Sequence, residues 1–531
     1  MKHFVAVAVA VAVAMLGVAA LAGPAGVADA AGVRALSVDA GHVTGRIRSL
    51  QGGAGLPRAG AVEGTTQLPD LTAQWRDAGI DFVRTFDWRA RLDTSDNPLS
   101  LFPRWSADPD DPKSYNFAAA DAWVKAVRGV GAELMFTLAT EIPTSSKPPA
   151  DLAKYERVVR RIVQHYNTGW AGGMKHAVRW WEYGDQPDFF RTHFDGTPAQ
   201  FYETYAGVTR AVKSVDPGLR VGGPNLAFPL NREAPFREGF LRAVRERKLP
   251  LDFISWIWFS DTTRDPLDFL RVAADVQGVL DANGLGQTRQ VLASFNMTGI
   301  ANAKPDPLQG AAFLGAAMTY LQDAKVDRAV LFRTDTGYDP YHQFRDPAHV
   351  FDEQGQFDAR GQVFRLFGRM KQTPQRLSVT GGDDRGFAVL AGRNAAGTLV
   401  QVLVTHYAIP GEYLEPTDKE MFEFILPLGP ERAKISFRTL KRRAADAADA
   451  GEQGFTLLLR NLPWGDRPYT ITHYRVDGAQ AGEPFGAAPG EGGTAMVSGD
   501  LAAPAVELIE LRLRSPARAA PAGVAAVSPS P

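Results

Sequence analysis

The sequence predicts an α/β protein in which a (β/α)8 barrel over residues 32–372 is followed by an antiparallel β-sandwich over residues 373–514. The first observation is that short apolar runs alternate with stretches of helical period from Arg46 to Met370, as in βα units. The second is that eight such runs fit the size of one closed barrel. The third is a change, past Gln375, to short alternating runs separated by turn residues, which is typical of antiparallel strands.

Eight apolar runs are expected to form the barrel strands, with helices between them. An open doubly wound sheet is the alternative, but it needs a glycine-rich turn that leads into a helix, and Gly52-Gly53-Ala54-Gly55 leads into none. The expected strands are 46–50, 81–86, 133–139, 178–183, 220–222, 252–259, 290–296 and 328–333, and the clearest helical stretches are 71–78, 152–166, 198–215, 266–282 and 308–322.

The second domain is expected to consist of antiparallel strands. Residues 35–38 precede the barrel and are expected to join this sheet, so the segment 32–40 is shared between the two domains. The Ala/Asp-rich segment 444–451 reads as a loop, and the Ala/Pro/Ser-rich tail 515–531 as disordered. The expected strands are 386–393, 398–406, 421–427, 455–459, 469–476 and 506–513.

The first 31 residues have the character of a signal peptide. Lys2 and His3 precede an Ala/Val/Leu-rich run, and Ala28-Asp29-Ala30 offers small residues around a cleavage point. A transmembrane anchor is the alternative, because the run approaches the ~20 apolar residues that a span needs. We expect cleavage, which makes the protein secreted or periplasmic and leaves no membrane span.

Composition excludes several classes of function. The chain has 58 Lys and Arg against 59 Asp and Glu, with no basic run, so nucleic acid is not an expected partner. It has no cysteine, which excludes disulfides and thiolate chemistry. No metal-binding or nucleotide-binding motif is present, and we expect no cofactor. A neutral partner fits these properties.

Several long motifs resemble glycoside hydrolase family 39. The fourth expected strand ends in WWEYGDQPD at residues 180–188, after HYNTGWAG at 165–172, and is similar to the family segment that ends W-E-x-W-N-E-P-D. VDPGLRVGGP at 215–224 and KLPLDFISW at 248–256 resemble the segments that follow, and YTITHYRVD at 469–477 resembles a strand of the family's accessory domain. The resemblance covers nearly all of the chain after the leader.

The resemblance implies retaining chemistry, which needs two carboxyl groups about 5–5.5 Å apart. The family's acid/base glutamate corresponds to Gln186, whose amide neither donates nor accepts a proton at useful pH. Its nucleophile, on strand seven, corresponds to Ser294 in VLASFN, with no base nearby in sequence. Both groups that the family uses for hydrolysis are therefore replaced.

Other positions that the resemblance assigns to the sugar site also differ. Asp185 stands where the family has Asn, and Gly184 where it has Trp. Ile257 and Phe259 stand where the family has His and Tyr. Concerted departures of this kind predict a site released from hydrolysis, by decay or by a new task. Because adjacent residues at a strand end point in different directions, Asp185 is not expected to replace Gln186 unless the loop redirects it.

Acidic and aromatic residues at the expected strand ends are candidates for ligand contacts, because ring faces stack on sugars. Arg84 is expected to form an ion pair across the barrel mouth, and Glu182 to have a structural or ion-pairing role. Arg333 and Asp335 fit a salt bridge as well as ligand contacts. The predicted substrate-binding set is Asp87, Trp88, Trp181, Glu182, Trp256, Trp258, Phe259, Asn296, Arg333 and Asp335, and Glu141 joins Asp185 as a catalytic candidate.

Three hypotheses follow. The first is a secreted protein of carbohydrate metabolism that binds a glycan at the barrel mouth without retaining hydrolysis, with exopolysaccharide assembly proteins as partners. The second is an active glycosidase with relocated carboxylates, drawn from Asp185, Glu141, Asp335 or Glu182. The third is a structural scaffold that binds nothing. Fold alone does not decide among them.

Overall fold

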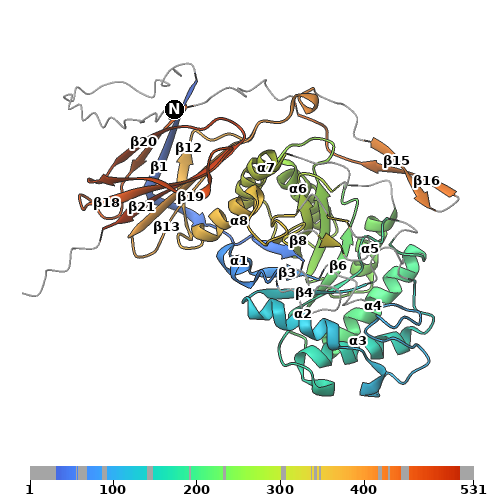
Figure 1. Cartoon of the computed structure of the whole chain (residues 1–531). Coiled ribbons are helices and arrows are strands. Elements are labelled where there is room, and N and C mark those ends of the chain that lie inside the picture. Colours follow the sequence, from blue (N-terminus) through green and yellow to red (C-terminus); the bar gives the residue numbers. More distant parts are fainter. Residues whose placement is uncertain are drawn as a thin grey trace, which may run out of the picture.

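The computed structural model shows two parts, a barrel wrapped by helices and an accessory sheet beside it (Figure 1). It describes residues 32–55, 57, 69–85, 92–139, 147–189, 193–230, 235–299, 306–335, 338–339, 344–345, 349–415, 421–428, 431–443 and 454–514.

Eight parallel strands close into a barrel in the order β2-β3-β4-β5-β6-β7-β8-β9. The predicted fold class is confirmed, and the closure of β2 on β9 excludes the open doubly wound sheet. The strands are β2 (Gly52–Ala54), β3 (Phe82–Arg84), β4 (Glu133–Leu138), β5 (Trp180–Tyr183), β6 (Arg220–Leu226), β7 (Phe253–Phe259), β8 (Arg289–Asn296) and β9 (Arg328–Leu331).

The first barrel strand lies later in the chain than the sequence predicted. The expected run 46–50 is instead the link between β1 (Val33–Arg46) and β2. Glycine has little strand propensity, which hides β2 in the sequence. Close packing requires glycine at both positions. A Cβ at Gly52 would lie 2.3 Å from the carbonyl oxygen of Ala329, and one at Gly53 would lie 2.2 Å from Oγ1 of Thr334.

Helices follow most of the barrel strands, and several have polar N-caps. Asp151 accepts a hydrogen bond from the Lys154 amide, and Thr197 forms a capping box with Gln200. Such caps satisfy amides that the first helical turn leaves free. The helices are α1 (Thr72–Asp77), α2 (Ala118–Gly129), α3 (Leu152–Asn167), α4 (Pro198–Val215), α5 (Pro235–Glu246), α6 (Asp268–Ala282), α7 (Pro307–Tyr320) and α8 (Ala359–Met370).

The barrel core has an inner and an outer layer. The outer layer joins the strands to the helices and includes Val83, Phe136, Trp181 and Ile254. These residues alternate along the strands with the inner ones, because successive side chains of a strand point to opposite faces. The inner cluster consists of Ala54, Phe82, Met135, Trp180, Phe253, Val291, Ala293 and Val330.

The accessory domain is a nine-stranded sheet in the order β19-β18-β21-β14-β13-β12-β1-β17-β20. All neighbours are antiparallel except β1 and β17. Residues 35–38 lie in β1, at the centre of one half of the sheet. The strands not yet given are β12 (Gln375–Thr380), β13 (Phe387–Arg393), β14 (Leu399–His406), β17 (Gly454–Arg460), β18 (Tyr469–Val476), β19 (Ala481–Gly490), β20 (Ala495–Asp500) and β21 (Ala505–Leu513).

This sheet bends over its own core. Strands β12 and β13 share only two residue pairs, Gln375 with Arg393 and Arg376 with Gly392. One apolar cluster nevertheless contains side chains from both sides of that corner, such as Leu36 and Leu457 from one half and Val402 and Ile509 from the other. The two halves therefore enclose a common core in the manner of a sandwich.

One predicted sandwich strand belongs elsewhere. The run 421–427 forms β15 (Met421–Leu428), which pairs with β16 (Glu431–Arg438) in a separate two-stranded ribbon. The ribbon lies apart from the accessory sheet (Figure 1). Its alternating pattern predicted a strand but not its partner, because alternation does not specify which sheet a strand joins.

Helix α7 connects the two parts. Its described side chains from Gly310 to Tyr320 are all buried, because α7 packs against the accessory strands β13, β14 and β21 as well as against the barrel. The approach is close at Gly315, where a Cβ would lie 2.8 Å from Oγ1 of Thr405. An ion pair between Arg443 and Asp265 adds a charged contact between the segment after β16 and the barrel.

Three predicted segments, 1–31, 444–451 and 515–531, lie outside the described residues. None of the helices in the described part of the chain combines the length and the apolar character that crossing a membrane requires.

Candidate functional site

A polar layer lies above the inner apolar cluster, at the carboxyl ends of the strands. Phe82, Met135 and Trp180 of the inner cluster are each followed, two residues later, by a polar residue. Because side chains two apart on a strand point to the same face, these three polar residues also point inward. They are Arg84, Thr137 and Glu182. Arg84 donates from Nε to Glu182 Oε2 at 2.7 Å, and the Thr137 hydroxyl donates to the same oxygen at 2.7 Å. The expected ion pair across the mouth is present.

Asp185 is the second carboxylate bound by Arg84. Its Oδ1 accepts from Arg84 Nη2 at 2.7 Å and from Asn225 Nδ2 at 2.6 Å, and its Oδ2 lies 3.6 Å from Nδ1 of His193. Burial alone would raise the pKa of Asp185, but Arg84 and His193 hold that pKa well below its ordinary value. Asp185 therefore stays ionised and has no proton to donate.

The same contacts fix the guanidinium of Arg84. Burial alone would lower the pKa of Arg84, but the charges of Glu182 and Asp185 raise it above its ordinary value. The exposed fractions of the Arg84, Glu182 and Asp185 side chains are 2%, 0% and 6%. The three charges thus form a closed, almost fully buried network.

Gln186 follows this network on a strained turn. It has a φ of 52°, and its amide donates to the carbonyl of Asn225 at 3.0 Å. Gly184 before it has a φ of 96°, and a Cβ there would lie 2.7 Å from Phe201, so the glycine is required by this packing. The side chain of Gln186 is partly exposed. At the position to which the resemblance assigns the acid/base, the turn thus presents an amide.

Asp188 ties this turn to β6. Its two carboxylate oxygens accept hydrogen bonds from the amides of Ala227 and Phe228, both at 2.9 Å. Burial raises the pKa of Asp188 to about 6, and these backbone bonds oppose part of the rise. With both oxygens engaged, the carboxylate positions the loop.

Ser294 faces inward because β8 contains a bulge. The register of β8 against β9 shifts between Leu292 and Phe295, both of which belong to the outer layer. Since neighbours on a strand point to opposite faces, Ser294 and Asn296 on either side of Phe295 face the barrel interior. Among the described residues no hydrogen-bond partner contacts the Ser294 hydroxyl, so nothing there activates it as a nucleophile.

Other predicted site residues are held by local contacts. The Asn296 side chain donates to the carbonyl of Phe332 and accepts from the amide of Met297, which links β8 to β9. Arg333 binds both oxygens of Asp335, at 3.0 and 2.7 Å. Phe259 is partly exposed, and its ring lies 5.8 Å from that of Phe332 in an edge-to-face arrangement.

Three predicted aromatic contacts are wrong. Trp181, Trp256 and Trp258 belong to the outer layer between strands and helices, and their exposed fractions are 0%, 0% and 7%. Trp256 donates to Oε1 of Gln290 at 3.2 Å. Alternation along β5 and β7 turns these rings away from the interior, whereas the sequence interpretation considered only their position near strand ends.

Three further candidates, Asp87, Trp88 and Glu141, lie outside the described residues. Sequence reasoning also missed three residues that contact the network or its partners, namely Asn225, His193 and Ser255, whose hydroxyl accepts from the Asn225 amide at 2.9 Å. Asn225 and Ser255 could have been found by following the strand-end rule along β6 and β7. His193 lies in a loop that carries no such signal.

The network leaves several polar atoms without protein partners. Glu182 Oε1 and Asn225 Oδ1 are buried and have no hydrogen-bond partner, and His193 Nδ1 has only its 3.6 Å contact with Asp185. Two are acceptors, and the imidazole nitrogen donates or accepts according to its tautomer. Enclosed atoms of this kind are usually satisfied by ordered water or by a bound polar group. Within the described part of the chain, no group of three or more His, Asp or Glu residues is arranged to hold a metal ion.

Comparison with known proteins agrees with this architecture. The model of the family described as glycosyl hydrolases family 39 matches residues 63–313. A curated β-xylosidase from Geobacillus stearothermophilus is 30% identical over 109 residues, which is 20% of this chain and spans only 21% of that protein.

Solved structures are similar over almost the whole chain. A structure described as a glucosidase from Croceicoccus marinus is 49% identical, with a TM-score of 0.86 and coverage of 91% of this chain and 99% of that one. A monomeric β-xylosidase from Caulobacter crescentus CB15 is 15% identical, with a TM-score of 0.65 and coverage of 91% and 100%, which shows the shared fold. The chain is therefore a glycoside hydrolase family 39-like protein.

Proposed function

We propose that this protein is exported and binds a neutral glycan at the barrel mouth without hydrolysing it by the two-carboxylate route. One observation carries the proposal: Gln186 and Ser294 stand at the positions to which the resemblance assigns the acid/base and the nucleophile. Of the described carboxylates on β5 and its loop, Glu182 and Asp185 are bound by Arg84, and Asp188 is held by the backbone amides of Ala227 and Phe228. A retaining mechanism needs one carboxylic acid and one free carboxylate, and this arrangement offers neither.

Binding is supported by what remains at the mouth. Phe259 offers a partly exposed ring at the inward end of β7, and ring faces pack against the apolar faces of sugars. The network also leaves Glu182 Oε1 and Asn225 Oδ1 without a protein hydrogen-bond partner, and both are acceptors of the kind that a hydroxyl group or a water molecule satisfies. Export is supported by the signal-like composition of residues 1–31.

A glycan array followed by calorimetry on the best neutral oligosaccharide tests this proposal. We expect binding that Phe259→Ala weakens about five- to tenfold, since an aromatic contact at a site is worth ~1–1.5 kcal/mol. Phe485→Ala in the accessory sheet is the matched control, because Phe485 is also partly exposed. If no neutral glycan binds, the scaffold hypothesis takes the place of this proposal.

A second function is favoured by the relative from Croceicoccus marinus, which is 49% identical and is described as a glucosidase. Under this alternative the chain hydrolyses a glucoside with relocated carboxylates. Asp185 and Glu182 are bound by Arg84, and Asp335 by Arg333. The alternative therefore depends most on Glu141, which follows β4.

Hydrolysis of aryl β-glucosides and β-xylosides separates the two functions. We expect no turnover by the wild-type protein above the uncatalysed rate, and only weak activity in the Gln186→Glu, Ser294→Glu double variant. Rescue is limited because Ile257 and Phe259 replace the His and Tyr that the resemblance assigns to the site. Wild-type turnover that disappears in Glu141→Gln or Asp185→Asn would establish the second function instead.

A further inference from the structure

At the opposite end of the barrel, a cavity of about 800 Å³ opens among the amino-terminal ends of the strands. Its walls come from the link between β1 and β2, the segments that enter β8 and β9, and the end of α8. It also adjoins the accessory sheet, since Arg46 pairs with Gln375 of β12. The volume is within the usual range of ligand sites, which often lie between domains.

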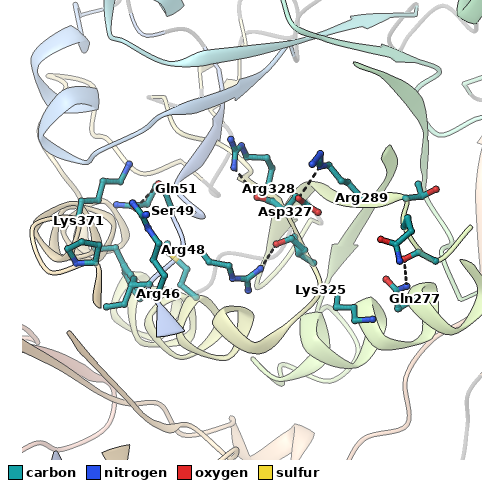
Figure 2. Close-up of a pocket in the computed structure, with 18 residues that line it drawn as sticks. Arg46, Arg48, Ser49, Gln51, Gln277, Arg289, Lys325, Asp327, Arg328 and Lys371 are labelled. Carbon is teal, nitrogen blue, oxygen red and sulfur yellow. Dashed lines mark hydrogen bonds and ion pairs between the residues drawn. The ribbon is translucent and has the colours of Figure 1, made fainter. Parts of the chain in front are cut away.

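The cavity is strongly basic although the whole chain has a net charge of −1. Six cationic side chains and one carboxylate, Asp327, are among its lining residues (Figure 2). Three of the cations are ion-paired, Arg289 with Asp327, Arg328 with Glu133 and Lys371 with Asp81. Phe367 is its one aromatic lining residue. The cations are Arg46, Arg48, Arg289, Lys325, Arg328 and Lys371.

Strand alternation places some of these charges. Arg289 and Arg328 stand two residues before the inner residues Val291 and Val330, so they point inward below the apolar cluster. The Arg328 guanidinium lies 5.3 Å from the ring of Phe82 and donates to Glu133 at 3.0 Å, while its Nε is enclosed and has no hydrogen-bond partner. The wall is thus built partly from fixed charges.

Three of the cations form no ion pair with any described carboxylate. Arg48 donates to the backbone carbonyls of Val326 and Leu321, and the charges of Asp327 and Asp323 attract its guanidinium without forming an ion pair with it. Arg46 and Lys325 are exposed and have no side-chain partner in the described part of the chain. Like charges held together repel one another, and a bound anion would relieve that repulsion.

We propose that this cavity binds an acidic saccharide through its oxyanion groups, as a second site distinct from the barrel mouth. A single phosphate would leave most of the cavity empty. A neutral sugar would need more than one aromatic wall, because stacking supplies much of its recognition. That the ligand is a saccharide rests on the proposed function, whereas its negative charge rests on the cavity alone.

Titration calorimetry with trigalacturonate, which carries three carboxylates, tests the proposal. We expect binding at low salt that weakens steeply as the salt concentration rises to about 0.5 M. In the Arg46→Glu, Lys325→Glu variant the affinity falls about tenfold or more, because two attractive charges become repulsive. The Lys113→Glu, Lys125→Glu variant makes the same change in net charge at exposed positions away from the cavity and keeps the wild-type affinity.

Several outcomes would overturn the proposal. One is the absence of trigalacturonate binding, and another is an equal loss in both charge-reversed variants, which would mean a non-specific charge effect. Binding of inorganic pyrophosphate without trigalacturonate would identify a free oxyanion as the ligand and not a saccharide. Trigalacturonate binding that Phe259→Ala abolishes and the cavity variant retains would move the acidic sugar to the mouth, which leaves the proposed function intact.

Discussion

At the carboxyl ends of the barrel strands the buried guanidinium of Arg84 contacts two carboxylates, whereas at the amino-terminal ends Arg46, Arg48 and Lys325 contact none among the described residues. The mouth therefore satisfies its charges internally, and what it offers a ligand is an aromatic ring and uncharged or already paired polar atoms. The basic cavity keeps positive charge available. The same barrel thus has one end suited to neutral hydroxyl groups and another suited to anions.

The difference between the two ends follows from how deeply their charged side chains are buried. A charge with no access to water must be paired, because desolvating a lone ion costs several kcal/mol or more. Arg84 has an exposed side-chain fraction of 2%, so its pairing is obligatory. Lys325 is exposed and hydrated, so it needs no partner.

The largest effect is expected at the mouth. Arg84→Met leaves Glu182 and Asp185 buried without a cation, and should lower the free energy of unfolding by about 5 kcal/mol, the upper part of the range for breaking a buried pair. Denaturant titration measures this loss. The triple variant Arg84→Met, Glu182→Gln, Asp185→Asn removes all three charges and should recover most of it. Equal losses in both variants would mean that packing, and not charge, makes Arg84 necessary.

The second prediction separates the faces of β7. Trp256→Ala should lower the free energy of unfolding by about 3–5 kcal/mol, because it empties a fully buried site in the outer layer. Phe259→Ala, three residues later on the inward face, should lower it by less than about 2 kcal/mol and affect glycan binding instead. If Trp256→Ala removed binding while stability was unchanged, the assignment of the two faces would be wrong.

The residues changed in these two variants also show how much of the structure could be predicted from the sequence. The motif at 180–188 and the alternation of apolar runs predicted a closed barrel, and the residues that close β3 and β5 correctly suggested an ion pair at the mouth. The tryptophans were misplaced because nearness to a strand end does not decide which way a side chain points. That direction depends on the register of the strand. For Ser294 the register is set by a β-bulge, which no residue type in the sequence indicates.

The basic cavity could not be predicted from the sequence, for a related reason. Its cations come from four separate segments, none of which is a basic run, and the total charge is balanced. Only closure of β2 against β9 brings Arg46 and Arg48 beside Arg328. Strand β2 itself was assigned six residues too early, since the glycines that let it approach its neighbours carry no strand signal.

The buried carboxyl group of Asp268 provides a third environment for a charge, to compare with the two ends of the barrel. Burial raises the pKa of Asp268 at the start of α6 to about 7, and the charge of Asp265 adds to the shift. The folded protein then holds a proton at pH 5 that the unfolded chain, with a pKa near ~3.9, has lost. The free energy of unfolding should therefore fall as the pH rises from about 4 to 7, by about 3 kcal/mol.

Asp268→Asn removes this titration, so the stability of the variant should depend less on pH over that window than the stability of the wild type. Unfolding titrations at several pH values provide the measurement, and Asp466→Asn at an exposed position is the control. Parallel profiles for wild type and Asp268→Asn would show that the carboxyl is ionised throughout.

The smallest effect is expected at the basic cavity. If Arg46, Arg48 and Lys325 repel one another, then Lys325→Ala should raise the free energy of unfolding by a few tenths of a kcal/mol at low salt, in the range of ordinary surface changes. The gain should vanish at about 1 M salt, where the screening length is near 3 Å. Lys113→Ala, an exposed lysine outside the cavity, should show no such gain. Thermal unfolding at the two salt concentrations measures the difference. A loss of stability in Lys325→Ala at low salt would mean that the lysine is attracted by its surroundings, and the cavity would then have no positive charge to spare for a ligand.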